Sequence, residues 1–167
     1  YHNWVLRDLA PSQRRITSTL AETASVFAES LVRDAALKSA DSRASRLAML
    51  DARLMAGTSF LMNIPARYAF ERALYPMRRQ GHFDPDVLTE TMLSCQKAAY
   101  QDHLESWYPH FWASKLHFYI AGRAFYNYPY TFGYLFAQLV YRQVLAEGDH
   151  AAYIRLLRRT GWDDAEP

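Results

Sequence analysis

The stretch of sequence that decides the fold is residues 17–32, which read TSTLAETASVFAESLV. Its apolar residues Leu20, Ala24, Phe27 and Leu31 follow one another at helical spacing, so they share one side of an α-helix. Pro and Gly are scarce in the chain as a whole, and no pair of alternating segments indicates a β-hairpin. The sequence therefore predicts an all-α fold with helices packed at various angles.

A second long helix is predicted from about Ser42. Because Pro65 lacks an N–H group and its ring clashes with the preceding turn, we expect a kink near Asn63–Ile64. The predicted core face of this helix consists of Leu47, Leu50, Leu54, Leu61 and Met62.

Residues typical of helix ends mark a third helix. We expect Asp84 to be its N-cap, with Pro85 in the first turn and Asp86 near the positive end of the helix dipole. The preceding residues 80–83 are predicted to form a loop.

The last third of the chain is predicted to contain a shorter helix over 112–120 and an irregular, tyrosine-rich stretch over 122–129. Helix then resumes, with Gly148 as its C-cap, and a final helix covers 150–159. Gly133 indicates close packing of the helix that contains it.

Composition limits the classes of function. The 167 residues suit one compact domain over 1–167, and 50% hydrophobic residues suffice for a core. A net charge of +2 argues against a nucleic-acid partner, which would require a strongly basic face.

A single cysteine, Cys95, fits a reducing compartment, so we expect a cytoplasmic protein. No apolar run is long enough to span a bilayer, so we expect no membrane partner. The chain begins at Tyr1, and we interpret it as a fragment.

Two carboxylates stand out in the first long helix. Glu22 and Glu29 are the only charged residues between Ile16 and Val32, and they lie on the side opposite the apolar residues. One interpretation is that Glu22 belongs to a capping box over 19–22 and both acids face solvent. The alternative is a helix buried on both sides, in which the two carboxylates need a cation, such as a metal ion.

An aromatic segment over 117–130 is the second candidate feature. Its tyrosines recur at every second position from 126, which suits an irregular segment presenting several phenols to one cleft. Neutral phenols and an imidazole could stabilise an oxyanion there. The alternative is an aromatic core whose hydroxyls bond to the backbone. Lys115 and Arg123 flank the segment and could hold a carboxylate, although solvated charges are commoner.

Other familiar motifs are absent from the sequence. It contains no His-Glu-x-x-His pair, cysteine cluster, phosphate-binding glycine loop or nucleophile elbow. Each histidine other than His117 is therefore interpreted as a surface or core residue.

Four segments resemble one known family in the right order. Residues 20–29 resemble the helix that supplies the third zinc ligand in the oligoendopeptidase F branch of the thimet oligopeptidase family. Residues 114–119 and 125–136 resemble the substrate-binding segment of that branch, and 1–3 resemble the residues that follow its His-Glu-x-x-His helix. The resemblance implies the C-terminal part of a zincin-type catalytic domain, from a zinc endopeptidase that acts on short peptides.

The resemblance also implies roles for individual residues. Glu22 would be the third zinc ligand, and Glu29 would orient a histidine ligand. The two histidine ligands and the general base would precede Tyr1, so we expect Zn²⁺ to be absent or weakly bound in this chain and the chain alone to be inactive. We expect it to pair with the missing N-terminal part, or to self-associate through the apolar surface left exposed.

For substrate binding, the resemblance implies that His117 and the tyrosines of the aromatic segment bind the scissile carbonyl and stabilise the oxyanion. Tyr126 and Tyr130 are the preferred assignments, and Tyr128 is the alternative. Two other functions remain open at this point. One is a non-catalytic helical module that binds a peptide or protein through the aromatic cleft, and the other, which the charge disfavours, is a helical nucleic-acid-binding regulator.

Overall fold

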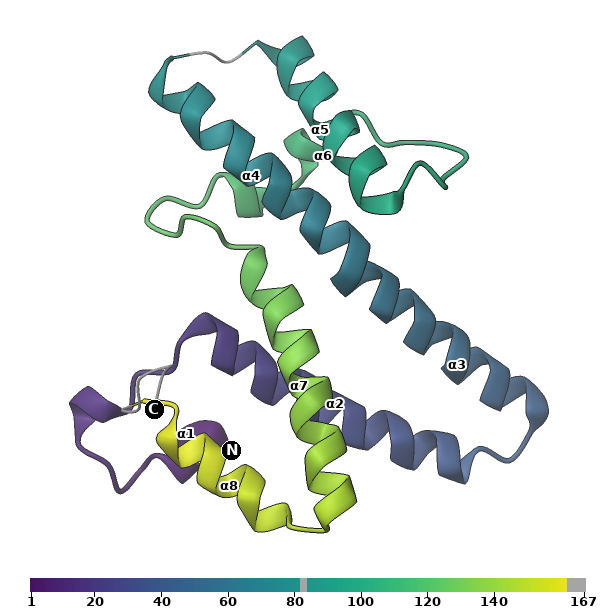
Figure 1. Ribbon diagram of the computed structural model, residues 1–167, viewed down its shortest axis with the longest axis vertical. Helices are drawn as coiled ribbons and strands as arrows, with labels where there is room; N and C mark the ends of the chain where they lie inside the picture. The colour runs from purple at the N-terminus through teal and green to yellow at the C-terminus, as the bar shows by residue number, and fades with distance from the viewer. Residues whose placement is uncertain (82–83, 162–167) are drawn as a thin grey trace. The chain divides into compact units, whose positions relative to one another are not determined.

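The computed structural model describes residues 1–81 and 84–161 (Figure 1). Within these ranges every regular element is helical and no strand occurs, which confirms the all-α prediction. His82 and Phe83, which end the predicted loop, lie outside the described residues. The chain divides into two compact units. The first unit is Tyr1–Met49 with Phe132–Pro167, and the second unit is Leu50–Thr131.

The first unit is built around one long helix and two segments from the chain's ends. Its elements are α1 (His2–Val5), the 3₁₀ turn η1 (Pro11–Gln13), α2 (Ser18–Ser39), α8 (His150–Arg159) and most of α7 (Tyr128–Glu147). Figure 1 shows α1 lying beside α8, and the two are in contact. The ring of Phe27 stacks on that of Tyr153 at 3.7 Å between centroids and meets that of Tyr141 edge-on at 5.7 Å. These rings join α2 to α7 and α8.

The helix predicted from residues 17–32 is present as α2, but only part of its apolar side is covered. Phe27 is buried, whereas Leu31 is 42% exposed. Hydrophobic periodicity identifies which side of a helix is apolar but does not show how far its neighbours extend along that side.

Gly133 allows α7 to approach α2 closely, as its position in the sequence indicated. A Cβ atom built on Gly133 would lie 2.6 Å from the Cβ of Glu22 and 3.0 Å from the backbone N of Thr23. Such distances are too short for any side chain, so only glycine allows this crossing. The backbone at Glu22 is thereby fixed against α7.

The second unit contains the larger apolar core. Its elements are the end of α3 (Arg43–Thr58), the π-helical turn η2 (Ser59–Asn63), α4 (Ile64–Arg79), α5 (Pro85–Tyr100), α6 (Phe111–Ser114) and the 3₁₀ turn η3 (Leu116–Phe118). In Figure 1 α4 and α5 lie side by side, and they are in contact. The buried side chains between these elements are Phe70, Leu74, Leu88, Met92, Phe111 and Phe118.

The predicted core face of the second long helix is wrong. Leu47, Leu50, Leu54 and Leu61 are between 41% and 72% exposed, and α3 contains no buried residue. The core face of this region belongs instead to α4, one element further along the chain. The apolar pattern of α3 marks a side that nothing in the described part of the chain covers.

Where a kink was predicted before Pro65, the structure has a π-helical turn that leads directly into α4. The N–H of Ile64 donates to the carbonyl of Ser59, five residues back. The next carbonyl, that of Phe60, would accept from residue 65, but a proline has no N–H to donate. The hydroxyl of Thr131 donates to it instead, at 2.7 Å. The start of α7 is therefore attached to the turn that Pro65 creates.

Three predicted helix-end features agree with the structure, whereas the irregular stretch predicted over 122–129 ends earlier, because α7 begins at Tyr128. The carboxylate of Asp84 accepts from the N–H of Asp86 at 2.9 Å, Gly148 has a φ of +65°, and α8 has the predicted bounds. The helix predicted over 112–120 is wrong, because Lys115 adopts an extended conformation that separates α6 from η3.

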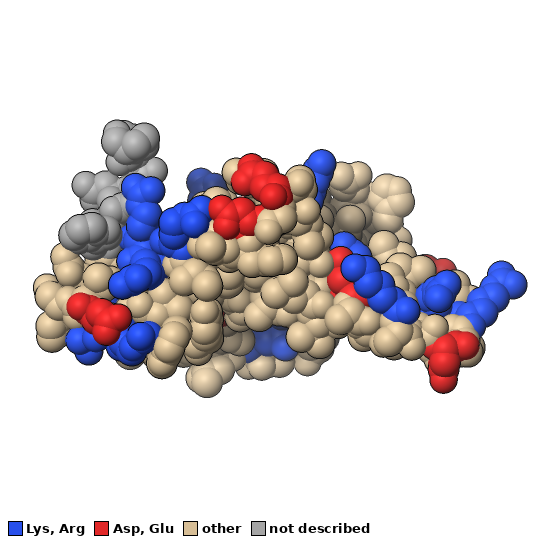
Figure 2. Space-filling view, turned by 90° about the horizontal axis from the view of Figure 1, so that it is seen from below, with Lys and Arg blue, Asp and Glu red and all other residues tan. Residues whose placement is uncertain are grey.

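No helix among the described residues is long and apolar enough to cross a bilayer. On the face drawn in Figure 2, basic and acidic side chains are interspersed among broad areas that carry neither charge.

The exposure of α3 leads to a stability prediction. Leu74→Ala removes a fully buried side chain and should lower the free energy of unfolding by about 2–5 kcal/mol. Leu54→Ala, at a residue that is 72% exposed, should change it by less than about 0.5 kcal/mol. Urea denaturation of both variants measures the difference. A loss at Leu54 as large as that at Leu74 would show that α3 is covered in solution.

Candidate functional site

The second unit brings together three of the residues predicted to bind substrate. The imidazole of His117, in η3, lies 4.9 Å from the ring of Tyr126 and 6.5 Å from that of Tyr130, measured between centroids. The two tyrosine rings are 6.0 Å apart. All three residues are half-buried. The imidazole and the two phenols thus form one cluster, which we call the His117 cluster.

The alternative assignment, Tyr128, lies outside this cluster. Its side chain is 45% exposed, and its ring contacts that of Tyr68 at 6.0 Å. Tyr128 is the first residue of α7 and Tyr130 lies in its first turn, whereas Tyr126 belongs to the irregular segment before the helix.

The imidazole of His117 is held in its neutral form. Partial burial lowers the pKa of His117, and the nearby positive charges of Arg67 and Lys115 lower it further. Its Nδ1 atom is inaccessible to solvent and has no hydrogen-bond partner. At neutral pH this side chain is therefore uncharged and can bind a ligand without first losing a proton.

A buried acid that sequence reasoning missed holds the tyrosine-rich segment in place. The carboxylate of Glu71, in α4, is fully buried. It accepts hydrogen bonds from the backbone N–H of Tyr126 at 3.0 Å and from that of Asn127 at 3.3 Å. Burial raises the pKa of Glu71, and these hydrogen bonds together with one from the hydroxyl of Tyr75 partly offset the effect. The position of Tyr126 thus depends on α4.

Tyr75 holds the backbone one residue earlier in the chain, at Phe125. Its hydroxyl accepts from the backbone N–H of Phe125 at 3.0 Å, so Glu71 and Tyr75 together bind three consecutive amides. Phe125 has a φ of +54°, a region that non-glycine residues seldom adopt. Its ring meets those of Tyr68 and Tyr75 at 5.9 and 4.9 Å. These contacts hold the strained residue immediately before the cluster.

The sequence did contain a signal for this arrangement. Asn63, Arg67, Glu71 and Tyr75 follow one another at intervals of four, which places them in one row along a helix. The adjacent row is apolar and buried, and consists of Ala66, Phe70 and Leu74. A polar row bordering a buried apolar row predicts polar groups at the edge of a core.

In the first unit, the predicted zinc ligand Glu22 is half-buried on α2. Burial raises the pKa of Glu22, and a hydrogen bond from the hydroxyl of Ser25 at 3.3 Å opposes this shift. The carboxylate makes no ion pair within the described part of the chain. It is therefore a partly desolvated acid without a neighbouring cation.

Two further predictions for these acids concern a capping box at Glu22 and the burial of Glu29. The capping box predicted over 19–22 is wrong, because α2 begins at Ser18 with Thr17 as its N-cap. Glu29 is exposed, and its carboxylate lies 2.6 Å from the guanidinium of Arg33 one turn further along. The helix is therefore not buried around Glu29, because a surface ion pair occupies that position.

Comparisons with known proteins add no family to this description. No protein-family model matches the chain, and the searches of curated proteins and of solved structures also gave no match. The functional argument therefore depends on the residues and their geometry.

The attachment by Glu71 can be tested by stability measurements. Glu71→Leu removes the acceptor of two buried amides and should lower the free energy of unfolding by about 1–3 kcal/mol. Glu71→Gln keeps one acceptor oxygen and should lower it less. Glu90→Leu, which removes an exposed carboxylate from α5, is the matched control and should have little effect. Equal stability of Glu71→Leu and the unmodified chain would refute the role.

The neutral state of His117 can be measured directly. In an NMR titration its imidazole should have a midpoint below 6.5, the ordinary value for histidine. Arg67→Gln should move the midpoint upward, since it removes a neighbouring positive charge. Arg72→Gln removes an exposed charge from the same helix and should not move it. Since the folded state disfavours the imidazolium, this residue should also reduce stability as the pH falls through 6.5. A midpoint at or above 6.5 in the unmodified chain would contradict the assignment.

Proposed function

We propose that this chain is the C-terminal part of the catalytic domain of a zinc-dependent endopeptidase of the oligoendopeptidase F type, which hydrolyses short peptides. The observation that supports the proposal is the His117 cluster. The residues that the resemblance assigned to binding the scissile carbonyl come from two separate segments, and these segments meet in the second unit.

The His117 cluster has suitable chemistry for this role. A neutral imidazole and two phenols are hydrogen-bond donors that carry no charge, so they can approach a carbonyl group without a counter-ion. When a peptide carbonyl is attacked, its oxygen acquires negative charge, and donors already fixed in position stabilise that charge. Glu71 and Tyr75 keep the backbone of this segment in place before any substrate arrives.

A catalytic zinc ion would require more ligands than the described residues bring together. A catalytic zinc site has three protein ligands and a water molecule. Among the described residues no group of three His, Cys, Asp or Glu side chains could hold a metal ion. The residues here do not by themselves fit the metal, so we assign no reaction step to it. In the proposal Glu22 contributes one carboxylate, and two histidines belong to a part of the parent protein outside this sequence.

The role implied for Glu29 needs a rearrangement. Its carboxylate is already paired with Arg33, and exposed ion pairs of this kind are weak. A histidine ligand could therefore compete for Glu29 at little cost. In the proposal, Glu29 orients a histidine ligand only when the rest of the zinc site is present.

A second candidate is a helical module that binds a peptide or protein without cleaving it. A groove of about 680 Å³ in the first unit favours it, because its walls are mainly apolar and come from α1, α2 and α8. Peptide binding by the parent without any hydrolysis would support this alternative.

The zinc ligand can be tested in the complete parent protein. Glu22→Gln should remove stoichiometric zinc and peptidase activity, because an amide is a poor zinc ligand. Glu90→Gln changes an exposed carboxylate and should alter neither. Elemental analysis and peptide hydrolysis provide the two readouts. Full zinc content in Glu22→Gln would refute the ligand role.

The oxyanion donors are tested separately from the metal. Tyr126→Phe or Tyr130→Phe in the parent should lower kcat by about 100-fold while zinc content stays unchanged. Tyr128→Phe, outside the His117 cluster, should lower it much less. Unchanged turnover in both of the first two variants would remove the cluster from the mechanism.

A further inference from the structure

Arg67 has a half-buried guanidinium group without a counter-charge. Its Nε atom is inaccessible to solvent and has no hydrogen-bond partner. Within the described part of the chain Arg67 makes no ion pair. Burial lowers the pKa of Arg67, although its side chain stays charged at neutral pH. Partly buried charges are normally paired, so this one needs an explanation.

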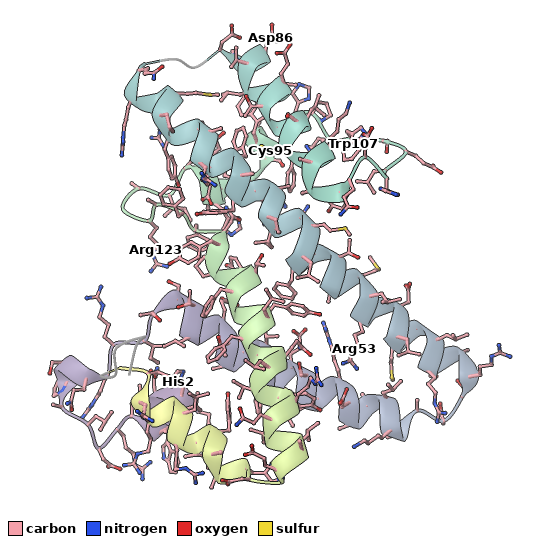
Figure 3. The ribbon with its side chains drawn as sticks, in the orientation of Figure 1. His2, Arg53, Asp86, Cys95, Trp107 and Arg123 are labelled. Carbon is pink, nitrogen blue, oxygen red and sulfur yellow. The ribbon has the colours of Figure 1, made fainter. Side chains whose placement is uncertain are left out.

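Two further cations, those of Lys115 and Arg123, lie near aromatic rings of the second unit. The guanidinium of Arg67 and the ammonium of Lys115 lie 5.2 and 5.1 Å from the centroid of the Phe111 ring. The guanidinium of Arg123 lies 6.0 Å from the ring of Tyr126, a member of the His117 cluster. Figure 3 shows Arg123 on the segment that precedes α7. The surroundings of the cluster are therefore positively charged.

The one buried acid nearby does not neutralise this charge through a direct contact. Glu71 lies one turn from Arg67 on α4, and its carboxylate attracts the guanidinium over a distance. Its oxygens, however, accept from the amides of Tyr126 and Asn127, and no ion pair with Arg67 is formed. Among the described residues, the buried side-chain polar atoms left without hydrogen-bond partners are Asn63 Oδ1, Arg67 Nε, His117 Nδ1 and both Oδ1 and Nδ2 of Asn127, all in the second unit.

We infer that Arg67 binds the C-terminal carboxylate of a short peptide whose last residues lie against the His117 cluster. A guanidinium binds a carboxylate through two parallel hydrogen bonds, and because Nε of Arg67 is inaccessible to solvent, the two terminal nitrogens would donate them. The aromatic rings of Phe111, Tyr126 and Tyr130 offer apolar contacts to the neighbouring side chains. The half-buried guanidinium group carries a single positive charge, so it suits a carboxylate monoanion better than a phosphate dianion. This inference rests on the proposed function and specifies its substrates as peptides that end shortly after the cleaved bond.

The inference is tested by binding to the 167-residue chain, without zinc or hydrolysis. The probes are N-acetyl-trialanine, its C-terminal amide and inorganic phosphate, each titrated at pH 7 and fixed ionic strength with NMR detection. The free acid should bind at least about tenfold more tightly than the amide, because only the acid forms charge-assisted hydrogen bonds. Arg67→Gln should abolish this preference, and Arg67→Lys should retain part of it. Arg72→Gln, an exposed arginine of the same helix, is the matched control and should retain all of it.

Equal binding of acid and amide by the unmodified chain, or no binding of either, would overturn the inference without requiring any variant to fold. A preference that survives in a folded Arg67→Gln variant would also overturn it, as would phosphate binding as tight as that of the acid. The zinc content and turnover of the parent do not enter these measurements. Failure of the carboxylate site is therefore distinguishable from failure of the proposed function.

Discussion

The hydrogen bonds from the backbone of Tyr126 and Asn127 to the buried carboxylate of Glu71 are the interaction on which the candidate site depends. A segment with a non-glycine residue at positive φ is strained, and such an acceptor helps to keep it in one conformation. Backbone amides that are buried require partners, and a carboxylate offers more acceptor positions than any other side chain. Because Glu71 is on a helix packed within the core of the second unit, that core determines where the tyrosines lie.

The same core also determines the charge state of His117. Desolvation and two neighbouring cations act in the same direction, and both favour the neutral imidazole. Protein sites bind carbonyl oxygens most consistently when the charge of their hydrogen-bond donors does not change over the working pH range. The His117 cluster is thus a set of neutral donors within a positively charged neighbourhood.

Local rules of sequence predicted local features well and tertiary contacts poorly. The cap at Asp84, the turn at Gly148 and the bounds of α8 follow from residue chemistry within one or two helical turns. The close approach at Gly133 was also indicated, because glycine inside a helix is costly unless a neighbour requires the space. The core face assigned to α3 was wrong, since periodicity cannot show whether a second element covers an apolar side. Glu71 was missed because a single acid within a charged stretch looks like a surface residue until its backbone partners, more than 50 positions away, are known.

Among the described residues, each unit contains a half-buried charged group that makes no ion pair. In the first unit this is the carboxylate of Glu22, and in the second it is the guanidinium of Arg67. Partial burial without a counter-charge lowers stability, and an apolar residue of similar size would serve packing better at either position. Arg33–Glu29 and Arg155–Asp149 are examples of ion pairs that form on the surface instead. In the proposals made above, the partner of Glu22 is a cation and the partner of Arg67 is an anion.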